Sequence, residues 1–244
     1  MAVTELWLVR HGESAANVAA STAEREGLEV IAAPARDADV ELSPIGLQQA
    51  QALGTWLGSL DAFQLPNSAI SSPYRRAEQT LLLATEWANI PLPSTVDERL
   101  RDRELGVLDL LTPLGVTSRM PQEAARKQWL GKFYYRPPGG ESWADVALRV
   151  RSFVSELDAH EGRVLITAHD AVIMNLLYVC LGWRESELLT FIQSNTVLNA
   201  SVTRLSRRPG DQTWTLDMFS HDDHLEAVGA PVTEHGGDTD VQPR

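Results

Sequence analysis

Short apolar runs that alternate with helical patterns constrain the fold of this chain most. Residues 6–9 (LWLV) and 163–168 (RVLITA) lack the alternation of a half-exposed strand, which predicts strands buried on both faces. Residues 68–71 (SAIS) have the length of a third strand. Because a helical pattern follows each run, we expect an α/β fold: a three-layer sandwich with a mainly parallel central sheet, helices on both faces and a lid-like insertion.

The helical patterns carry recognisable start and stop signals. Ser14 and Ser43 are candidate N-caps, and Asp170 is a candidate cap for a buried helix that Gly182 would end. The five expected helices cover residues 15–26, 42–60, 72–89, 141–162 and 170–182. A weaker strand at 94–100 and a hairpin around 206–212 complete the expected elements.

The remaining segments predict the domain organisation. Residues 105–140 contain Gly, Pro and aromatic residues with little periodicity, apart from a helical pattern at 121–131, and are expected to form a lid. Residues 1–220 are expected to form one domain. Acidic residues, Gly and Pro in 221–244 predict a flexible tail.

Composition excludes several classes of protein. The formal net charge of −12 argues against a nucleic-acid partner. No apolar run approaches the roughly 18 residues of a membrane span, and the first residues lack a basic signal-peptide region. The single cysteine, Cys180, lies in an apolar helical pattern and is expected to be a buried thiol. We therefore expect a cytoplasmic protein without a membrane partner, and a homo-oligomer is neither predicted nor excluded.

Charged and imidazole side chains follow the expected strands. Arg10 and His11 come directly after the first strand, and His169 directly follows residues 163–168. Arg75 and Arg76 start the helix after the second strand. Because the carboxyl ends of parallel strands meet at one edge of the sheet, these groups should converge there. Arginine forks and helix N-termini bind phosphate, and a neutral imidazole can act as a nucleophile toward phosphorus.

Each of these residues also has an ordinary structural interpretation. An Arg-His pair can simply end a strand, and two arginines on a helix usually form a solvated face. His169 could be a satisfied buried histidine, and Asp170 is well explained as an N-cap. These interpretations fit each group singly but leave their common placement at strand ends unexplained.

Six motifs in this order resemble those of the histidine phosphatase superfamily, which includes the cofactor-dependent phosphoglycerate mutases. They span about residues 4–206. The motifs are LVRHGES (8–14), DVELSPIGLQQAQALG (39–54), SSPYRRAEQT (71–80), LRDRELG (100–106), VLITAHDAVI (164–173) and NASVTRL (199–205).

The resemblance implies specific roles at a phosphate site. His11 would become the transient phosphohistidine, and Arg10, Arg76 and His169 would hold the phosphoryl oxygens. The Arg-Ala spacing of the motif selects Arg76, and adjacent helical residues point about 100° apart, so Arg75 cannot share the role.

Two polar residues, Ser14 at the end of the first motif and Asn17 shortly after it, are also expected at the site. Ser14 starts a helix whose N-terminus would face the anion. Asn17 matches a family Asn and would contact the phosphate or substrate. Gly12 would permit a close backbone approach.

The proton donor for the leaving group has three candidates. The family register places Asp102 where most of this branch has Glu. Asp170 is the alternative, because the acid phosphatase and phytase branch uses the Asp of a His-Asp pair. Glu104 is nearby but out of register.

The resemblance also bears on whether the chain is a phosphatase or a mutase. Arg103, an expected substrate contact, is shared with the mutases, but the mutase Tyr is replaced by Leu105. We therefore expect a phosphatase acting on a small phosphorylated substrate, with a mutase or a non-catalytic phospho-ligand-binding module as the alternatives. No cofactor is expected. No metal is expected either, since arginines crowd the first site and HDDH (221–224) fits a solvated tail.

Overall fold

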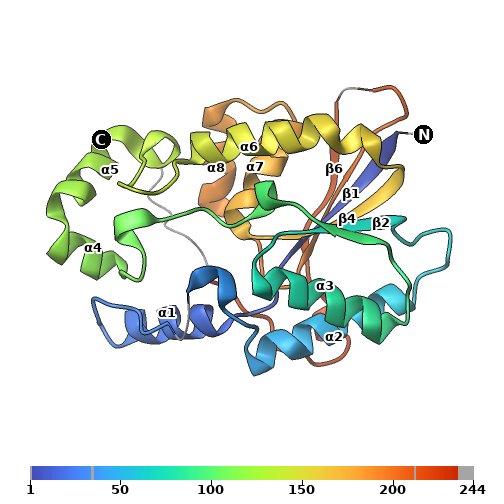
Figure 1. The fold of residues 1–244 in the computed structure, drawn as a ribbon, viewed down its shortest axis with the longest axis horizontal. Coiled ribbons are helices and arrows are strands. Elements are labelled where there is room, and N and C mark those ends of the chain that lie inside the picture. The colour runs from blue at the N-terminus through green and yellow to red at the C-terminus, as the bar shows by residue number, and fades with distance from the viewer. Residues whose placement is uncertain (1, 34–35, 212, 236–244) are drawn as a thin grey trace.

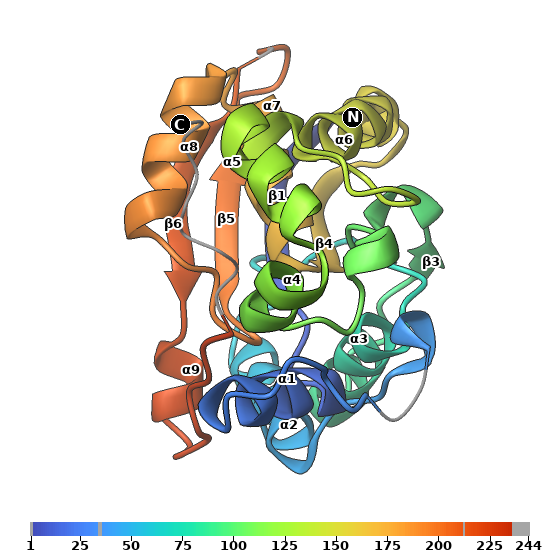
Figure 2. The same cartoon turned by 90° about the vertical axis from the view of Figure 1, so that its left-hand side faces the viewer.

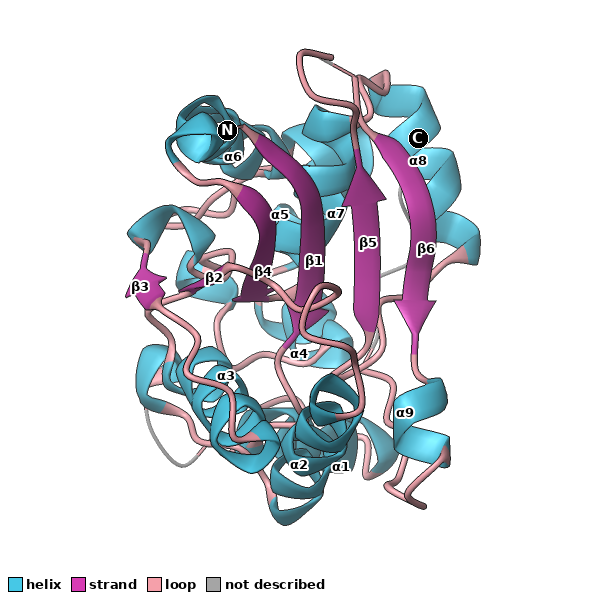
Figure 3. Ribbon diagram, turned by 90° about the vertical axis from the view of Figure 1, so that its right-hand side faces the viewer, coloured by secondary structure: helices cyan, strands magenta, loops and turns pink. Residues whose placement is uncertain are grey.

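The computed structural model of this chain describes residues 2–33, 36–211 and 213–235, and their strands form one six-stranded sheet in the order β3-β2-β4-β1-β5-β6. The first four strands of this order are parallel, β5 is antiparallel to β1, and β6 is antiparallel to β5 (Figure 3). The strands are β1 Val3–Arg10, β2 Ser68–Ser71, β3 Ser94–Val96, β4 Gly162–Ala168, β5 Val202–Ser206 and β6 Thr215–His221.

Helices cover both faces of this sheet, so the expected three-layer α/β fold is confirmed. In Figure 1, α6, α7 and α8 lie on one side of the strands, and α2 and α3 lie on the other. Figure 2 looks at the end of the sheet toward which β1 runs, with α4 and α5 of the expected lid nearest the viewer. The helices are α1 Ala15–Arg25, α2 Pro44–Gly58, α3 Arg75–Ala88, α4 Pro113–Arg119, α5 Pro121–Tyr134, α6 Trp143–Glu156, α7 Asp170–Cys180, α8 Glu185–Ser194 and α9 Asp223–Glu226.

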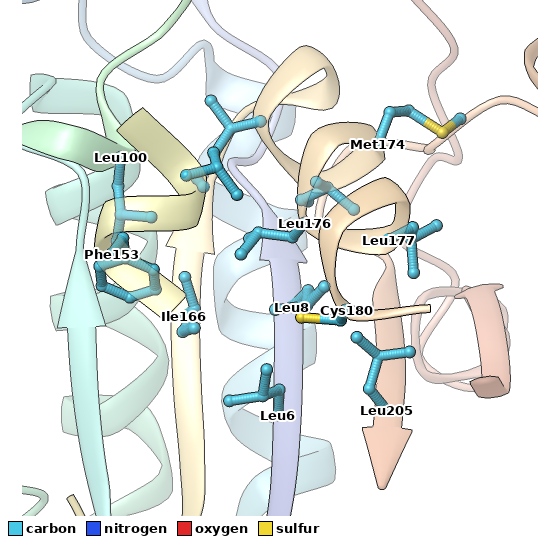
Figure 4. Packing of buried hydrophobic residues seen from close by; sticks show 14 of the residues in the cluster. Leu6, Leu8, Leu100, Phe153, Ile166, Met174, Leu176, Leu177, Cys180 and Leu205 are labelled. Atoms are coloured by element: carbon cyan, nitrogen blue, oxygen red, sulfur yellow. The ribbon is translucent and has the colours of Figure 1, made fainter. Parts of the chain in front are cut away.

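The central strands are buried on both faces, as their unbroken apolar runs predict. Along β1, Leu6 and Leu8 belong to the core under α6 and α7, whereas Trp7 and Val9 belong to the core under α2 and α3. Figure 4 shows the first of these cores, where side chains of the sheet meet those of α7, including Cys180. Because both faces are packed, β1 and β4 are held rigidly and their ends can position functional groups accurately.

The observed elements differ from the predicted ones at several places, and α4 within the expected lid was not predicted at all. The helix expected from Ser72 begins at Arg75, because the Ser72 side chain is engaged elsewhere. Asp170 is the first residue of α7 and not its cap, which is His169. Helix α8 was not predicted from the sequence, although Leu188, Leu189 and Ile192 give it a buried face.

The flexible tail expected from residue 221 is corrected for residues 221–235, which pack on the domain. β6 ends at His221, and α9 buries His224 and Leu225. Gln49 on α2 donates from Nε2 to the carbonyl oxygen of Pro231 at 2.8 Å. These side-chain contacts are not visible in an acidic, Gly-containing sequence. The rest of the predicted tail, 236–244, lies outside the described residues.

Among the described helices, none has the length and apolarity needed to cross a membrane.

The buried His224 predicts a pH dependence of stability. Burial lowers its pKa from 6.5 to about 4, so the folded state keeps the ring neutral where the unfolded state binds a proton. Neutral His224 makes its full contribution to the free energy of unfolding above pH 6.5. As the pH falls below 6.5, this contribution is lost at up to about 1.4 kcal/mol per pH unit. Between pH 7.5 and pH 5.0, the free energy of unfolding in urea should fall less for His224→Gln than for the wild type. The Gln amide can still donate to the Ala200 carbonyl oxygen. Equal losses in both proteins would contradict this.

Candidate active site

Three strand ends deliver polar residues to one place. The His11 amide donates to the carbonyl oxygen of Ala168 at 3.0 Å, and the Ser72 amide donates to that of Thr167 at 2.9 Å. His11, Ser72 and His169 therefore leave β1, β2 and β4 at the same edge of the sheet. The rings of His11 and His169 lie 5.1 Å apart, as the convergence of strand ends predicts.

His11 is a neutral imidazole with a defined tautomer. Its Nδ1 lies 2.7 Å from the carbonyl oxygen of Gly12, which can only accept, so Nδ1 carries the proton and Nε2 presents the lone pair. Burial, followed by the nearby charge of Arg76, holds the pKa of His11 well below 6.5. The ring is 2% exposed. An imidazole in this environment is unprotonated across the neutral range.

Arg76, which the motif spacing selects, is the buried member of the arginine pair. Arg76 is 3% exposed, whereas the side chain of Arg75 is 54% exposed and pairs with Glu41. Its Nε donates to Nε2 of His11 at 3.2 Å, and Nη2 donates to Asp102 Oδ2 at 2.9 Å. Asp37 holds the other end of the guanidinium.

Arg10 enters the site from the last position of β1. Its Nη1 donates to the Val197 carbonyl oxygen, and Nη2 donates to that of His235 at 3.0 Å. The Nε–H is buried and finds no hydrogen-bond partner among the described residues. Because an unpaired buried donor is costly, this N–H is suited to receive an anionic ligand.

His169 and Asp102 form the opposite wall of the site. His169 Nε2 lies 2.8 Å from Ser72 Oγ, and its Nδ1 lies 3.3 Å from Asp102 Oδ2. Burial lowers the pKa of His169 against the pull of Asp102. Burial works to raise the pKa of Asp102, but His169 and Arg76 overcome it and hold that pKa well below 3.8. Asp102 is therefore ionised at neutral pH.

Asp170 has the opposite electrostatic character. Burial raises its pKa, with Arg10 opposing, and within the described part of the chain its buried Oδ1 has no hydrogen-bond partner. The third candidate acid, Glu104, is exposed and accepts a hydrogen bond from the Tyr74 hydroxyl at 2.8 Å.

The N-terminus of α1 lines the same cavity. Ser14 accepts from the Asn17 amide at 3.2 Å, and the Ser14 amide donates to Asn17 Oδ1 at 3.1 Å, forming a capping box. Asn17 Oδ1 is thus occupied by the cap. Gly12 lies against α2, where an added Cβ would meet the Gly46 carbonyl oxygen at 2.7 Å, so the expected close approach is observed.

Arg10, His11, Arg76, Asp102 and Asp170 line a cavity of about 400 Å³. Arg103, whose Nε donates to the Glu141 carbonyl oxygen at 2.8 Å, lines it beside Leu105. Lys127 and Lys132 reach it from α5. Away from the histidines, part of the wall is apolar: Ala16, Ala20, Ile31, Ala33, Leu110 and Leu111. The cavity therefore combines a cationic end with room for an organic group.

Sequence reasoning missed Asp37, Ser72 and His235 as residues of the site and named Glu13 only as a hydrogen-bond partner without a firm role. Asp37 holds Arg76, and Ser72, which was expected to start a helix, holds His169. Glu13 accepts from Ser43 Oγ at 2.6 Å and lies 3.1 Å from His235 Nε2. Their partners lie far away in the sequence, so no local pattern indicates these contacts. Only Glu13 lies near the Arg-His pair, inside the first motif.

The segment from 231 to 235 closes the site around Arg10, and this predicts a truncation effect. A chain that ends at Ala230 loses the His235 carbonyl that Arg10 binds and the His235–Glu13 pair. Its affinity for orthophosphate should fall about ten- to a hundredfold, because hydrogen bonds to charged groups are lost.

Calorimetric titration of orthophosphate against this chain and a control chain ending at His235 measures the effect. Circular dichroism confirms that both are folded. Equal phosphate affinities would show that the segment does not complete the site.

Among the described residues, no cluster of three or more His, Cys, Asp and Glu side chains could hold a metal ion. His221 Nε2 instead lies 3.1 Å from Asp223 Oδ2 within the HDDH stretch.

Comparisons with known proteins agree with this geometry. The family model of the histidine phosphatase superfamily (branch 1) matches residues 6–219. A metal-independent phosphoserine phosphatase of Arabidopsis thaliana is 28% identical over 99% of this chain and 90% of that protein. A glucosyl-3-phosphoglycerate phosphatase of Mycobacterium tuberculosis is 30% identical over 90% of this chain and 96% of that protein. The solved structure of a mycobacterial glucosyl-3-phosphoglycerate phosphatase has a TM-score of 0.70 at 29% identity, covering 90% of this chain and 99% of that chain. This chain therefore belongs to the histidine phosphatase superfamily, branch 1.

Proposed function

We propose that this chain is a phosphatase that hydrolyses phosphate monoesters through a phosphohistidine at His11. The observation that carries the proposal is the neutral imidazole of His11, which lines the cavity with Arg10 and Arg76 and whose ring lies 5.1 Å from that of His169. Superfamily membership and relatives named as phosphatases support hydrolysis of a small phosphorylated substrate.

In the first step, the substrate phosphoryl group lies between the arginines and the N-terminus of α1. The lone pair of His11 Nε2 forms a bond to phosphorus, and the ester P–O bond breaks with its electron pair on the leaving oxygen. Arg10 stabilises the charge on the equatorial oxygens, for which its unpaired Nε–H is available. The leaving oxygen takes a proton from a carboxylic acid.

Asp170 is our proposed proton donor, although the sequence placed Asp102 first. A general acid must hold a proton at the operating pH. Burial raises the pKa of Asp170, whereas Asp102 is held ionised by His169 and Arg76. In this proposal Asp102 is a positioning residue that orients both of its partners. The Asp170 carboxylate then accepts a proton from the water that attacks the phosphohistidine, which releases phosphate and regenerates His11.

A mutase is the second candidate function, because Arg103 lines the cavity as the resemblance implies. Leu105 lines the cavity too, and its side chain cannot form the hydrogen bond of the mutase tyrosine. Without that contact, the substrate is not positioned to take the phosphoryl group back from the phosphohistidine. Hydrolysis of the phosphohistidine by water is therefore favoured.

Steady-state phosphate release tests the proposal. The panel contains an aryl phosphate, phosphoserine and glucosyl-3-phosphoglycerate, of which the last two come from the names of the relatives. Conversion of 3-phosphoglycerate to 2-phosphoglycerate is measured with and without 2,3-bisphosphoglycerate. Multiple turnovers on a monoester support the phosphatase. Isomerisation without phosphate release would identify a mutase, and phosphate binding without turnover would identify a binding module.

A further inference from the structure

Arg76 has no free donor in this structure. An arginine side chain has five N–H bonds. Nε donates to His11, and Nη1 donates to the carbonyl oxygen and Oδ1 of Asp37 at 2.7 and 2.9 Å. Nη2 donates to Asp37 Oδ2 at 3.2 Å and to Asp102 Oδ2 at 2.9 Å. Every N–H that could bind a phosphoryl oxygen therefore already has a protein acceptor.

One of these contacts also occupies the lone pair of His11, the proposed nucleophile. The lone pair of His11 Nε2 accepts from Arg76 Nε at 3.2 Å, so it is not directed at a substrate phosphorus. Arg10 differs, because its buried Nε–H has no partner. An incoming phosphate can thus engage Arg10 at once but must displace an acceptor before it engages Arg76.

Asp37 is the acceptor that can be displaced. Asp102 is also held by the Arg103 amide at 2.8 Å and lies beside His169. Among the hydrogen bonds described, both carboxylate oxygens of Asp37 are bound by Arg76 alone. The Asp37 side chain is 41% exposed and lies on the short turn Asp37–Asp39, so it can move into solvent without disturbing the core.

We propose that Asp37 occupies the phosphate position of Arg76 and sets the affinity of the site for phosphate. Carboxylate and phosphate both present pairs of oxygens that fit the arginine fork, so the two compete for the same donors. When the substrate phosphoryl group replaces Asp37, Arg76 turns toward it and releases His11 Nε2. Free phosphate binds more weakly than it would to an open site, because part of its binding free energy displaces Asp37.

The inference rests on the proposed function, and Asp37→Asn tests it. This variant keeps the size of the side chain and removes the charge that competes for Arg76. The affinity for orthophosphate, measured by calorimetric titration, should rise about tenfold. KM for an aryl phosphate and the inhibition constant of phosphate should fall together, with a smaller change in kcat. Asp37→Ala should act in the same direction.

Glu41→Gln is the matched control, because Glu41 binds the adjacent Arg75 outside the cavity. It removes an equal charge from the same segment and should leave the phosphate affinity unchanged. If Asp37 only orients Arg76, Asp37→Asn will weaken phosphate binding, and that result or an unchanged affinity would overturn the inference. A failure of the proposed function is distinguishable, since the wild type would then release no phosphate from any monoester.

Discussion

Alanine at position 11 is expected to lower kcat/KM for an aryl phosphate by about 10⁴-fold or more. The substitution removes the only atom proposed to form a bond to phosphorus, and the remaining charges can only position a water molecule. The arginines stay in place, so orthophosphate should still bind. Mixing with labelled substrate followed by an alkaline quench should trap label on the wild-type protein and none on the variant.

His221→Ala is the control for this experiment, since His221 ends β6 and does not line the cavity. It should retain wild-type turnover. Comparable turnover by the His11→Ala variant would remove the phosphohistidine route. The variant would then have to use another nucleophile or activate water directly.

Asparagine at position 170 is expected to have an effect that depends on the leaving group. For an alkyl phosphate, whose leaving oxygen needs a proton, kcat should fall about 10²- to 10³-fold. For an aryl phosphate with a weakly basic leaving group, the fall in the phosphoryl-transfer rate should be less than about tenfold. Burst kinetics separates this first step from hydrolysis of the phosphohistidine, in which Asp170 also takes part.

Asp102→Asn discriminates between the two carboxyl groups. Asp102 binds Arg76 and lies beside His169, so its loss should slow both substrates by a similar factor. If Asp102→Asn shows the dependence on the leaving group and Asp170→Asn does not, the two roles must be exchanged. Equal effects of both variants on both substrates would point to Glu104 or to solvent as the proton source.

The layers of the fold could be predicted because a buried strand or helix has a recognisable pattern of apolar residues in its own sequence. The unbroken apolar runs at β1 and β4 and the periodic stripe on α6 are such patterns. The placement of Arg10, His11 and His169 followed from the rule that parallel strands end at one edge. The choice of Arg76 over Arg75 came from the Arg-Ala spacing of the motif, and helical geometry added that only one of the two could serve.

The contacts that complete the site were not predictable in the same way. Asp37 lies in a segment without periodicity, and its bond to Arg76 depends on how that segment crosses the sheet edge. Ser72 carries the local signal of a helix start, yet its hydroxyl binds His169, 97 residues away. For His235 the sequence predicted the opposite, a flexible tail, because hydrogen bonds between distant segments leave no pattern in either segment.

The bond between Arg10 and His235 links residues that are 225 positions apart. Synthesis proceeds from the N-terminus at about 5–20 residues per second, so the arginine leaves the ribosome long before its carbonyl partner exists. During that interval the sheet can begin to pack, and the Val197 carbonyl oxygen can accept from Arg10 Nη1, but Nη2 still lacks the acceptor that His235 supplies. We therefore expect the full phosphate affinity to be acquired last. A chain interrupted before His235 would bind phosphorylated compounds more weakly, by the factor predicted above for the chain that ends at Ala230.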